Sequence, residues 1–279
     1  MPDWIVHIAI ALVISLVFKI KNWKLVILGS VLPDLPRVLL IILTYLDFNE
    51  INSFLILEPL HTPFITVLES LAIALIFKNP LQNFLLIYLG VITHLFSDFL
   101  QFAGKFGHLM LYPFSYKQFS MGLFYGGHVI YPIIGLIVLI ISFYFLKNKK
   151  NNLELNKKFY LSIVPLIIIL IFMFSTPGKI LENNVHGTDF LLNPDKYNNE
   201  EVSLYHVKVV SLNAVEEMSH LVKIETKENL KLNSFITVSG IYKDNKIYVN
   251  DIFHNTETKL YSSFLGLFIF IFLIFKKND

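Results

Sequence analysis

The chain contains no cysteine, and charged residues are scarce in it. Without cysteine there are no disulfide bonds, and any metal ion must be held by nitrogen and oxygen ligands. Charged residues make up 16% of the 279 residues, which is well below the share of about 25% typical of soluble proteins. A net charge of only +2 argues against a broad nucleic-acid-binding surface, so no nucleic-acid partner is expected.

Apolar residues dominate the composition instead, at 54% with 26 phenylalanines. Several apolar runs approach the length of about 20 residues that a bilayer core requires. The runs fall at 4–18, 25–46, 62–77, 81–103, 129–146, 159–174 and 260–275. We therefore predict an α-helical polytopic membrane protein with six to seven spans. The first run is expected to be retained, because Asp3 replaces the basic start of a signal peptide and no small-residue cleavage site follows.

Lysines cluster at alternate ends of these runs, which places all of them on one side of the predicted membrane. By the positive-inside rule that side is cytoplasmic, together with the C-terminal Lys276 and Lys277. The long polar stretch 176–259 is then extracytoplasmic. We expect a multi-pass protein of the cell membrane with this orientation.

Three parts follow from the composition along the chain. Residues 1–175 are predicted as a transmembrane helical bundle, and 260–279 as a C-terminal transmembrane helix with a cytoplasmic basic tail. Between them, 176–259 alternates apolar and polar residues, as in FITVSGIY and KIYVNDIF, with turns such as KDNK. This pattern predicts about five short strands in a small all-β domain, an antiparallel sheet or barrel that resembles an OB-fold.

The most informative residues are ionisable side chains inside apolar runs. In GVITHLFSDFL, His94 and Asp98 are four residues apart and share one helix face. A charge at the centre of a membrane helix costs roughly 2.5–3.5 kcal/mol, so retained ionisable residues there indicate function. Asp34, His61 and His7 lie in comparable settings. Together the five residues predict a buried metal site.

Each of these residues has a simpler interpretation that the sequence leaves open. His94 and Asp98 could form a helix-face hydrogen bond or a proton relay. His61 precedes Pro63 and could cap a helix, and His7 could reach the lipid headgroups. Asp34 lies in GSVLPDLPRV, where two prolines predict a broken helix that is tolerated only inside protein or beside a cavity.

Four short motifs in a fixed order resemble the YdjM-like family of membrane-bound, metal-dependent hydrolases, over roughly residues 1–145. They are His7 in the first run, the G-S-x-L-P-D segment 29–34, His61 with Thr62, and the G-x-x-x-H-x-x-x-D segment 90–98. The later MLYPFS is similar to a Trp-Pro or Tyr-Pro segment of that family. One departure is that the His-Arg pair common before the later histidine is replaced here by ILEPLHTP, in which Glu58 is the only nearby ligand type.

This resemblance implies a hydrolase in which a divalent metal activates water to attack an ester or phosphoester. The expected ligands are His7, Asp34, His61, His94 and Asp98, with His7 either a fifth ligand or a donor to another ligand. Zinc is the expected ion, although manganese and iron accept the same ligands. The predicted position in the outer leaflet favours a lipid or lipid-linked substrate, with the bilayer as the other partner.

Two further residues are assigned candidate catalytic roles beside the metal. A carboxylate that does not bind the ion, Glu58 or Asp34, could serve as the general base. Arg37 is the only arginine in the chain, and its planar fork of donors suits phosphate oxygens. Its simpler interpretation is an ion pair with Asp34, three residues earlier.

Two other classes of function remain open at this stage. The same His and Asp residues could form a metal or proton transport path, although the inner halves of the predicted spans are almost wholly apolar. Alternatively the bundle is an anchor and the β-domain a binding module. His108 and His128 are expected either to line an entrance or to be ordinary interface residues, and His186 is expected to have no catalytic role.

Overall fold

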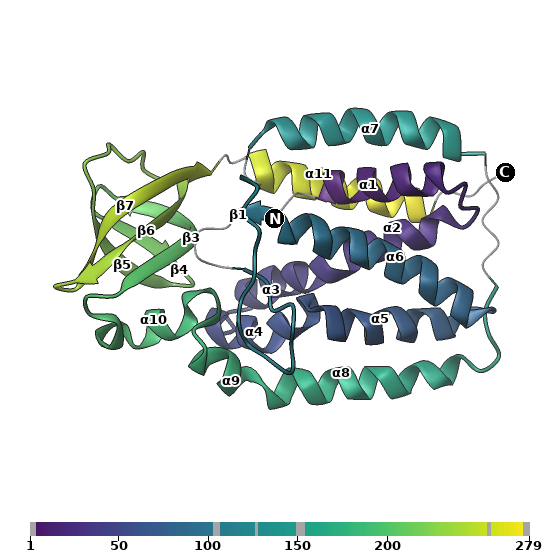
Figure 1. Ribbon diagram of the computed structural model, residues 1–279, viewed down its shortest axis with the longest axis horizontal. Coiled ribbons are helices and arrows are strands. Elements are labelled where there is room, and N and C mark those ends of the chain that lie inside the picture. The colour runs from purple at the N-terminus through teal and green to yellow at the C-terminus, as the bar shows by residue number, and fades with distance from the viewer. Residues whose placement is uncertain (1–3, 103–106, 126–127, 149–153, 256–257, 276–279) are drawn as a thin grey trace.

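The computed structural model describes residues 4–102, 107–125, 128–148, 154–255 and 258–275. Helices that run side by side form one part of the molecule, and a β-barrel lies at one end of them (Figure 1). Lys276 and Lys277, predicted as a basic tail, lie outside the described residues.

The bundle is built from helices whose starts follow from the local sequence. Proline occupies one of the first two positions of three of its longer helices, where its missing N–H costs no helical hydrogen bond. The Asn49 side chain accepts a hydrogen bond from the backbone N–H of Asn52 and so caps a fourth. The elements are α1 (Trp4–Val17), α2 (Trp23–Val31), η1 (Leu32–Asp34), α3 (Leu35–Tyr45), α4 (Glu50–Leu57), η2 (Glu58–His61), α5 (Pro63–Ile76), α6 (Pro80–Phe99), α7 (Ile130–Leu146), η3 (Phe159–Ser162), α8 (Ile163–Ser175) and α11 (Thr258–Phe275).

Two glycines allow α2 and α6 to pack backbone against backbone. A Cβ atom at Gly29 would lie 1.8 Å from the carbonyl oxygen of Ile87, and one at Gly90 would lie 2.0 Å from that of Val26. No side chain larger than hydrogen fits at either position. This close approach brings the end of α2 beside the middle of α6, which fixes where the candidate site can form.

At the two prolines, where the sequence predicts a broken helix, the helix instead tightens into a 3₁₀ turn. The 3₁₀ turn η1 joins α2 to α3, and Trp23–Tyr45 reads as one apolar helix of 23 residues. Proline stands second in η1 and second in α3, where it removes few helical hydrogen bonds.

The prediction of six to seven membrane spans is wrong. Among the described residues, two helices are long and apolar enough to cross a membrane, Trp23–Tyr45 and Pro80–Phe99. A third is added only if Glu50–His61 and Pro63–Ile76, bent by 73°, count as one span. The other apolar runs form shorter helices; α1 has 14 residues, or about 21 Å, against a hydrocarbon core of about 30 Å. The two long apolar helices still favour association with a membrane.

The polar region folds into a closed barrel with strand order β3-β4-β5-β7-β6. The five strands close the barrel through pairs that are antiparallel except β5 with β7, which are parallel. The antiparallel prediction is therefore wrong for this one pair. Alternate side chains such as Leu204, Val215 and Val238 fill its interior. The strands are β3 (Glu201–Ser211), β4 (Ala214–Glu217), β5 (His220–Glu225), β6 (Phe235–Lys243) and β7 (Lys246–Asn255).

Helical turns, not strands, occupy the first part of the stretch 176–259. Ile180, Val185 and Phe190 from these turns pack into the same hydrophobic core as the barrel and α4. The turns therefore connect the two parts of the molecule. They are α9 (Pro177–Glu182), η4 (Val185–Gly187), α10 (Thr188–Leu192) and η5 (Pro194–Tyr197), and a short parallel pair elsewhere joins β1 (Gln101–Phe102) to β2 (Phe124–Tyr125).

Candidate metal centre

Four of the five predicted metal ligands converge inside the bundle. Asp34 ends η1, His61 ends η2, and His94 and Asp98 lie one turn apart on α6. Each offers one ligand atom, and these four atoms all lie within 4.8 Å of one another. None of the four residues is more than 5% exposed.

The local sequence explains how three separate segments meet. The spacing of four residues places His94 and Asp98 on one face of α6. Asp34 and His61 each end a short 3₁₀ turn, and each turn contains a proline, Pro33 or Pro59. The two turns lie against each other and aim their last side chains at the same face of α6.

The distances between ligand atoms suit one shared ion. The Nε2 atom of His61 lies 3.2 Å from Nε2 of His94 and 3.2 Å from Oδ2 of Asp98. Nε2 of His94 lies 3.4 Å from the same Asp98 oxygen. Oδ1 of Asp34 lies 3.7 Å from Nε2 of His61 and 3.9 Å from Nε2 of His94. Donors about 2.0–2.2 Å from one ion at tetrahedral angles stand roughly 3.3–3.6 Å apart, so the residues present fit a zinc-like ion.

A hydrogen bond to the backbone orients the His94 ring so that its Nε2 lone pair faces the other three ligand atoms. Nδ1 of His94 lies 2.7 Å from the backbone carbonyl oxygen of Ser30. A carbonyl can only accept, so Nδ1 carries the proton and donates, and the neutral ring directs the lone pair of Nε2 into the cluster. Oδ1 of Asp34 and Oδ2 of Asp98 are buried without a hydrogen-bond partner in the part of the chain that the structure describes. A metal ion or a proton shared between these buried acceptors would satisfy them.

His7, the fifth predicted ligand, lies beside this group. Its ring stacks on that of His94 at 3.8 Å between centroids, and its Nε2 lies 3.5 Å from Oδ1 of Asp98. The Ser97 hydroxyl donates its one proton to the carbonyl oxygen of His94 at 2.8 Å, so His7 Nδ1 donates to the Ser97 oxygen at 3.1 Å. The same Asp98 oxygen accepts a hydrogen bond from Gln101 Nε2 at 2.8 Å. With its proton on Nδ1, His7 has a lone pair on Nε2 that cannot donate to Asp98 and that has no hydrogen-bond partner among the described residues. His7 therefore lies beside the four-residue group as a further nitrogen that could bind a cation.

The two remaining predicted site residues lie next to the cluster, outside the four-residue group. Glu58 is buried, and its Oε1 lies 3.4 Å from Nε2 of His186. Arg37 makes no ion pair with Asp34 or with any other described carboxylate, so the simpler interpretation of Arg37 does not hold. Glu58 interacts electrostatically with both Arg37 and His61.

Two histidines near the site make contacts with it that the sequence did not predict. The His108 ring lies 5.4 Å from that of His61, and burial lowers the pKa of His108 to about 3, which keeps it neutral. His186 reaches Glu58 from η4, where no ligand spacing marked it. The contact of Gln101 with Asp98 was predictable from the sequence, because Gln101 lies about one helical turn after Asp98. His128, the other loop histidine, is exposed.

Comparison of the chain with known protein families, with curated proteins and with solved structures finds no match. The resemblance to the YdjM-like family therefore stays a prediction. What the structure supplies is a buried group of two imidazoles and two carboxylates that could hold a metal ion.

Proposed function

We propose that the protein is a membrane-associated, metal-dependent hydrolase with Asp34, His61, His94 and Asp98 as its metal ligands. The observation that carries the proposal is the convergence of four buried ligand atoms, with His94 fixed by Ser30 so that its lone pair faces inward. Hydrolysis is favoured over other metal chemistry by the resemblance to the YdjM-like hydrolases.

The donor set suits zinc, and manganese or iron would accept the same ligands. A bound divalent ion would supply an activated water and would stabilise negative charge on the substrate. The protein's own contribution is to hold the ligands in place and to exclude bulk water from them, since all four are buried.

Glu58 and Arg37 complete the proposed site. Glu58 is the buried carboxylate next to the four ligands, and the His186 ring that faces its Oε1 favours its ionised form, so Glu58 could orient a water molecule as a hydrogen-bond acceptor. Arg37 lies on the same side and has no carboxylate partner among the described residues, which leaves its guanidinium available to a phosphate group. This pair favours a phosphoester over a neutral ester.

The position of the site favours a lipid or lipid-linked substrate. Three of the four ligands belong to Trp23–Tyr45 and Pro80–Phe99, the two helices apolar enough to cross a membrane. A substrate that approaches from the bilayer would reach this depth without crossing a polar surface.

We further propose that the barrel lies outside the cell and that the opposite end of the bundle faces the cytoplasm. Lys19, Lys21 and Lys78 lie in the turns at the end of the bundle away from the barrel (Figure 1). Because the chain has no cysteine, Leu212→Cys in the barrel and Lys21→Cys at the far end can be labelled singly. An impermeant maleimide applied to intact cells should label the first and spare the second; the reverse pattern would overturn the orientation.

The proposed function is tested first by metal content. Elemental analysis of purified protein should find about one zinc, manganese or iron ion per chain, and none in a His94→Ala, Asp98→Ala double variant. The control is Asn83→Ala, which removes a buried side chain of the same helix whose hydrogen bond goes to the Lys78 carbonyl oxygen. The control should keep its metal.

In the competing explanation, the same four residues share a proton and take part in proton transport. This explanation predicts no metal in the purified protein, even after incubation with zinc and manganese. That result would end the hydrolase proposal.

A further inference from the structure

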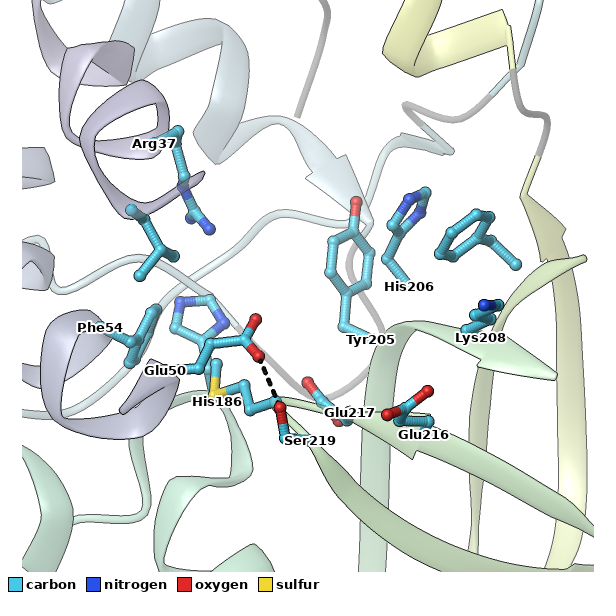
Figure 2. Close-up of a pocket in the computed structure, with 13 residues that line it drawn as sticks. Arg37, Glu50, Phe54, His186, Tyr205, His206, Lys208, Glu216, Glu217 and Ser219 are labelled. Carbon is cyan, nitrogen blue, oxygen red and sulfur yellow. Dashed lines mark hydrogen bonds between the residues drawn. The ribbon is translucent and has the colours of Figure 1, made fainter. Parts of the chain in front are cut away.

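A second polar region lies between the barrel and the bundle, apart from the four metal ligands. It is a pocket of about 450 Å³, within the range of small-molecule sites. Figure 2 shows Arg37 and Glu50 entering it from the bundle side, and Tyr205, Lys208 and Glu217 from the barrel side. Nothing in the proposed metal chemistry explains the barrel side of this pocket.

One side of the pocket is acidic and incompletely satisfied. Oε2 of Glu217 is buried without a hydrogen-bond partner in the described residues, and Glu50 lies close enough to act on its charge. Burial, together with the charge of Glu50, raises the pKa of Glu217 well above its usual range. Glu50 accepts a hydrogen bond from the Ser219 hydroxyl at 3.5 Å, and His220 also acts on its charge. A cationic group between the two carboxylates would stabilise both.

Another part of the pocket carries the guanidinium of Arg37. Arg37 also lines a smaller cavity of about 10 Å³, together with Glu58 and His61, and this cavity shares Leu40 and Phe54 with the large pocket. A volume of this size holds about one water molecule. Arg37 therefore lies between the large pocket and the metal ligands, so an anion held by it would be the part of a ligand nearest to them.

The barrel has a β-bulge where it lines the pocket. The register of β3 against β6 shifts between Leu204 and Val207, and the two residues of the bulge, Tyr205 and His206, both line the pocket. The His206 ring stacks on Phe235 at 4.8 Å. Bulges redirect side chains and are frequent beside binding sites.

We propose that this pocket binds a phosphoethanolamine-type group, with its phosphate at Arg37 and its primary ammonium between Glu50 and Glu217. A primary ammonium has three N–H donors and can satisfy both carboxylates, which a trimethylammonium group cannot. This inference rests on the proposed function in one respect, namely that the bound group is taken to be part of the hydrolase substrate.

The group could belong to a lipid or to a soluble phosphodiester. A lipid source fits the apolar face of α3, which exposes Leu39, Ile42 and Tyr45 on the helix that carries Arg37. Acyl chains could lie along this face while the head group enters the pocket.

The test is isothermal titration of the full chain with three soluble probes. Glycerophosphoethanolamine carries both charges, glycerophosphoglycerol only the phosphate, and ethanolamine only the amine. We expect the first to bind, and Arg37→Gln and Glu217→Gln each to weaken it about tenfold or more, the size expected for one charged hydrogen bond. The control is Glu228→Gln, which changes an exposed carboxylate of the barrel that pairs with His254. It should leave binding unchanged.

A second measurement separates the two sources. The protein is reconstituted with equal phosphatidylethanolamine and phosphatidylglycerol, repurified, and its retained lipids are quantified by mass spectrometry. Enrichment of phosphatidylethanolamine that is lost in Glu217→Gln supports the lipid source, whether or not the soluble probe binds. Binding of the soluble probe without enrichment supports a soluble phosphodiester.

Three results would overturn the inference: equal binding of glycerophosphoglycerol, binding of ethanolamine as tight as that of the complete group, or neither binding nor enrichment. The same titration on the His94→Ala, Asp98→Ala variant keeps the two proposals apart. Binding should persist there, because the pocket contains none of the four ligands. If metal is absent from the wild type but binding is seen, only the hydrolase proposal fails.

Discussion

The candidate metal centre and the barrel pocket hold their charged groups in different ways. In the metal centre, four buried residues on helical segments place their ligand atoms within 4.8 Å of one another. In the pocket, charged side chains from two parts of the molecule surround an open space of about 450 Å³. A rigid buried group can select an ion by fixed distances, whereas an open pocket selects a ligand by how its charges are arranged. The two regions should therefore respond differently to substitution.

The largest effect is expected from Asp98→Asn, which should remove metal-dependent stability. A site filled at 100 to 1,000 times its dissociation constant stabilises a fold by about 3–4 kcal/mol. Addition of zinc to the metal-free wild type should raise its melting temperature by several degrees, and the variant should show no such rise. Scanning calorimetry in detergent measures both.

Glu217→Gln serves as the contrasting variant in the same experiment. It alters the barrel pocket and should keep the full metal-dependent rise. A rise in Asp98→Asn equal to that of the wild type would mean that the ion binds elsewhere.

Gly90→Ala should cost the next largest amount, without changing any ligand. The added Cβ would meet the Val26 carbonyl oxygen at 2.0 Å, so α2 and α6 must separate. Overpacking of this kind costs about 1–3 kcal/mol or more. The separation also moves Ser30 away from His94, so the affinity for metal should fall as well.

Gly178→Ala is the matched control, because nothing lies within 4 Å of a Cβ atom placed there. Chemical denaturation and a zinc titration of both variants measure the effects. Wild-type affinity in Gly90→Ala would show that the close contact of the two helices does not position the site.

The candidate metal centre was predictable as a cluster because burial of its residues is costly. Imidazoles and carboxylates inside apolar runs indicate a site without any knowledge of the fold. The pocket gave no such signal, since Glu50 and Glu217 read as ordinary surface residues of a helix and a strand. Their approach depends on how the barrel docks on the bundle, which local pattern does not encode. The contact of Glu58 with His186 was missed for the same reason.

The membrane prediction failed on a different physical point. Apolar composition reports that a run is buried in protein or lipid, but it does not set where a helix ends. Trp4–Val17 and Ile130–Leu146 are as apolar as the long helices yet shorter than a span. Much of the apolar surface of Trp4–Val17 packs within the bundle, for example Ile5 and Leu12. Ile130–Leu146 instead buries only one face, with Leu139, and leaves Ile133 and Ile137 more than half exposed.

Glu58→Gln probes the boundary between the two regions and should have a smaller effect. It removes the charge that faces His186 but no proposed metal ligand. Loss of a charge-assisted hydrogen bond in a buried pair costs about 1–3 kcal/mol. Elemental analysis should find unchanged metal while denaturation finds lower stability; loss of the metal would instead place Glu58 among the ligands.

The smallest effect is the contribution of Glu217, in the pocket, to the way stability depends on pH. Because the pKa of Glu217 is raised on folding, the folded state holds this proton more tightly than the unfolded state. Glu217 therefore costs no stability below its unfolded pKa of about 4.5, and it destabilises the fold progressively as pH rises from there through the raised value. Glu217→Gln should flatten this decline, and Glu228→Gln, on an exposed barrel carboxylate, should leave it as in the wild type. Denaturant unfolding at intervals from pH 4.5 to 8 measures the slopes, and equal slopes in wild type and Glu217→Gln would mean that this carboxyl is not held in a buried, acidic pocket.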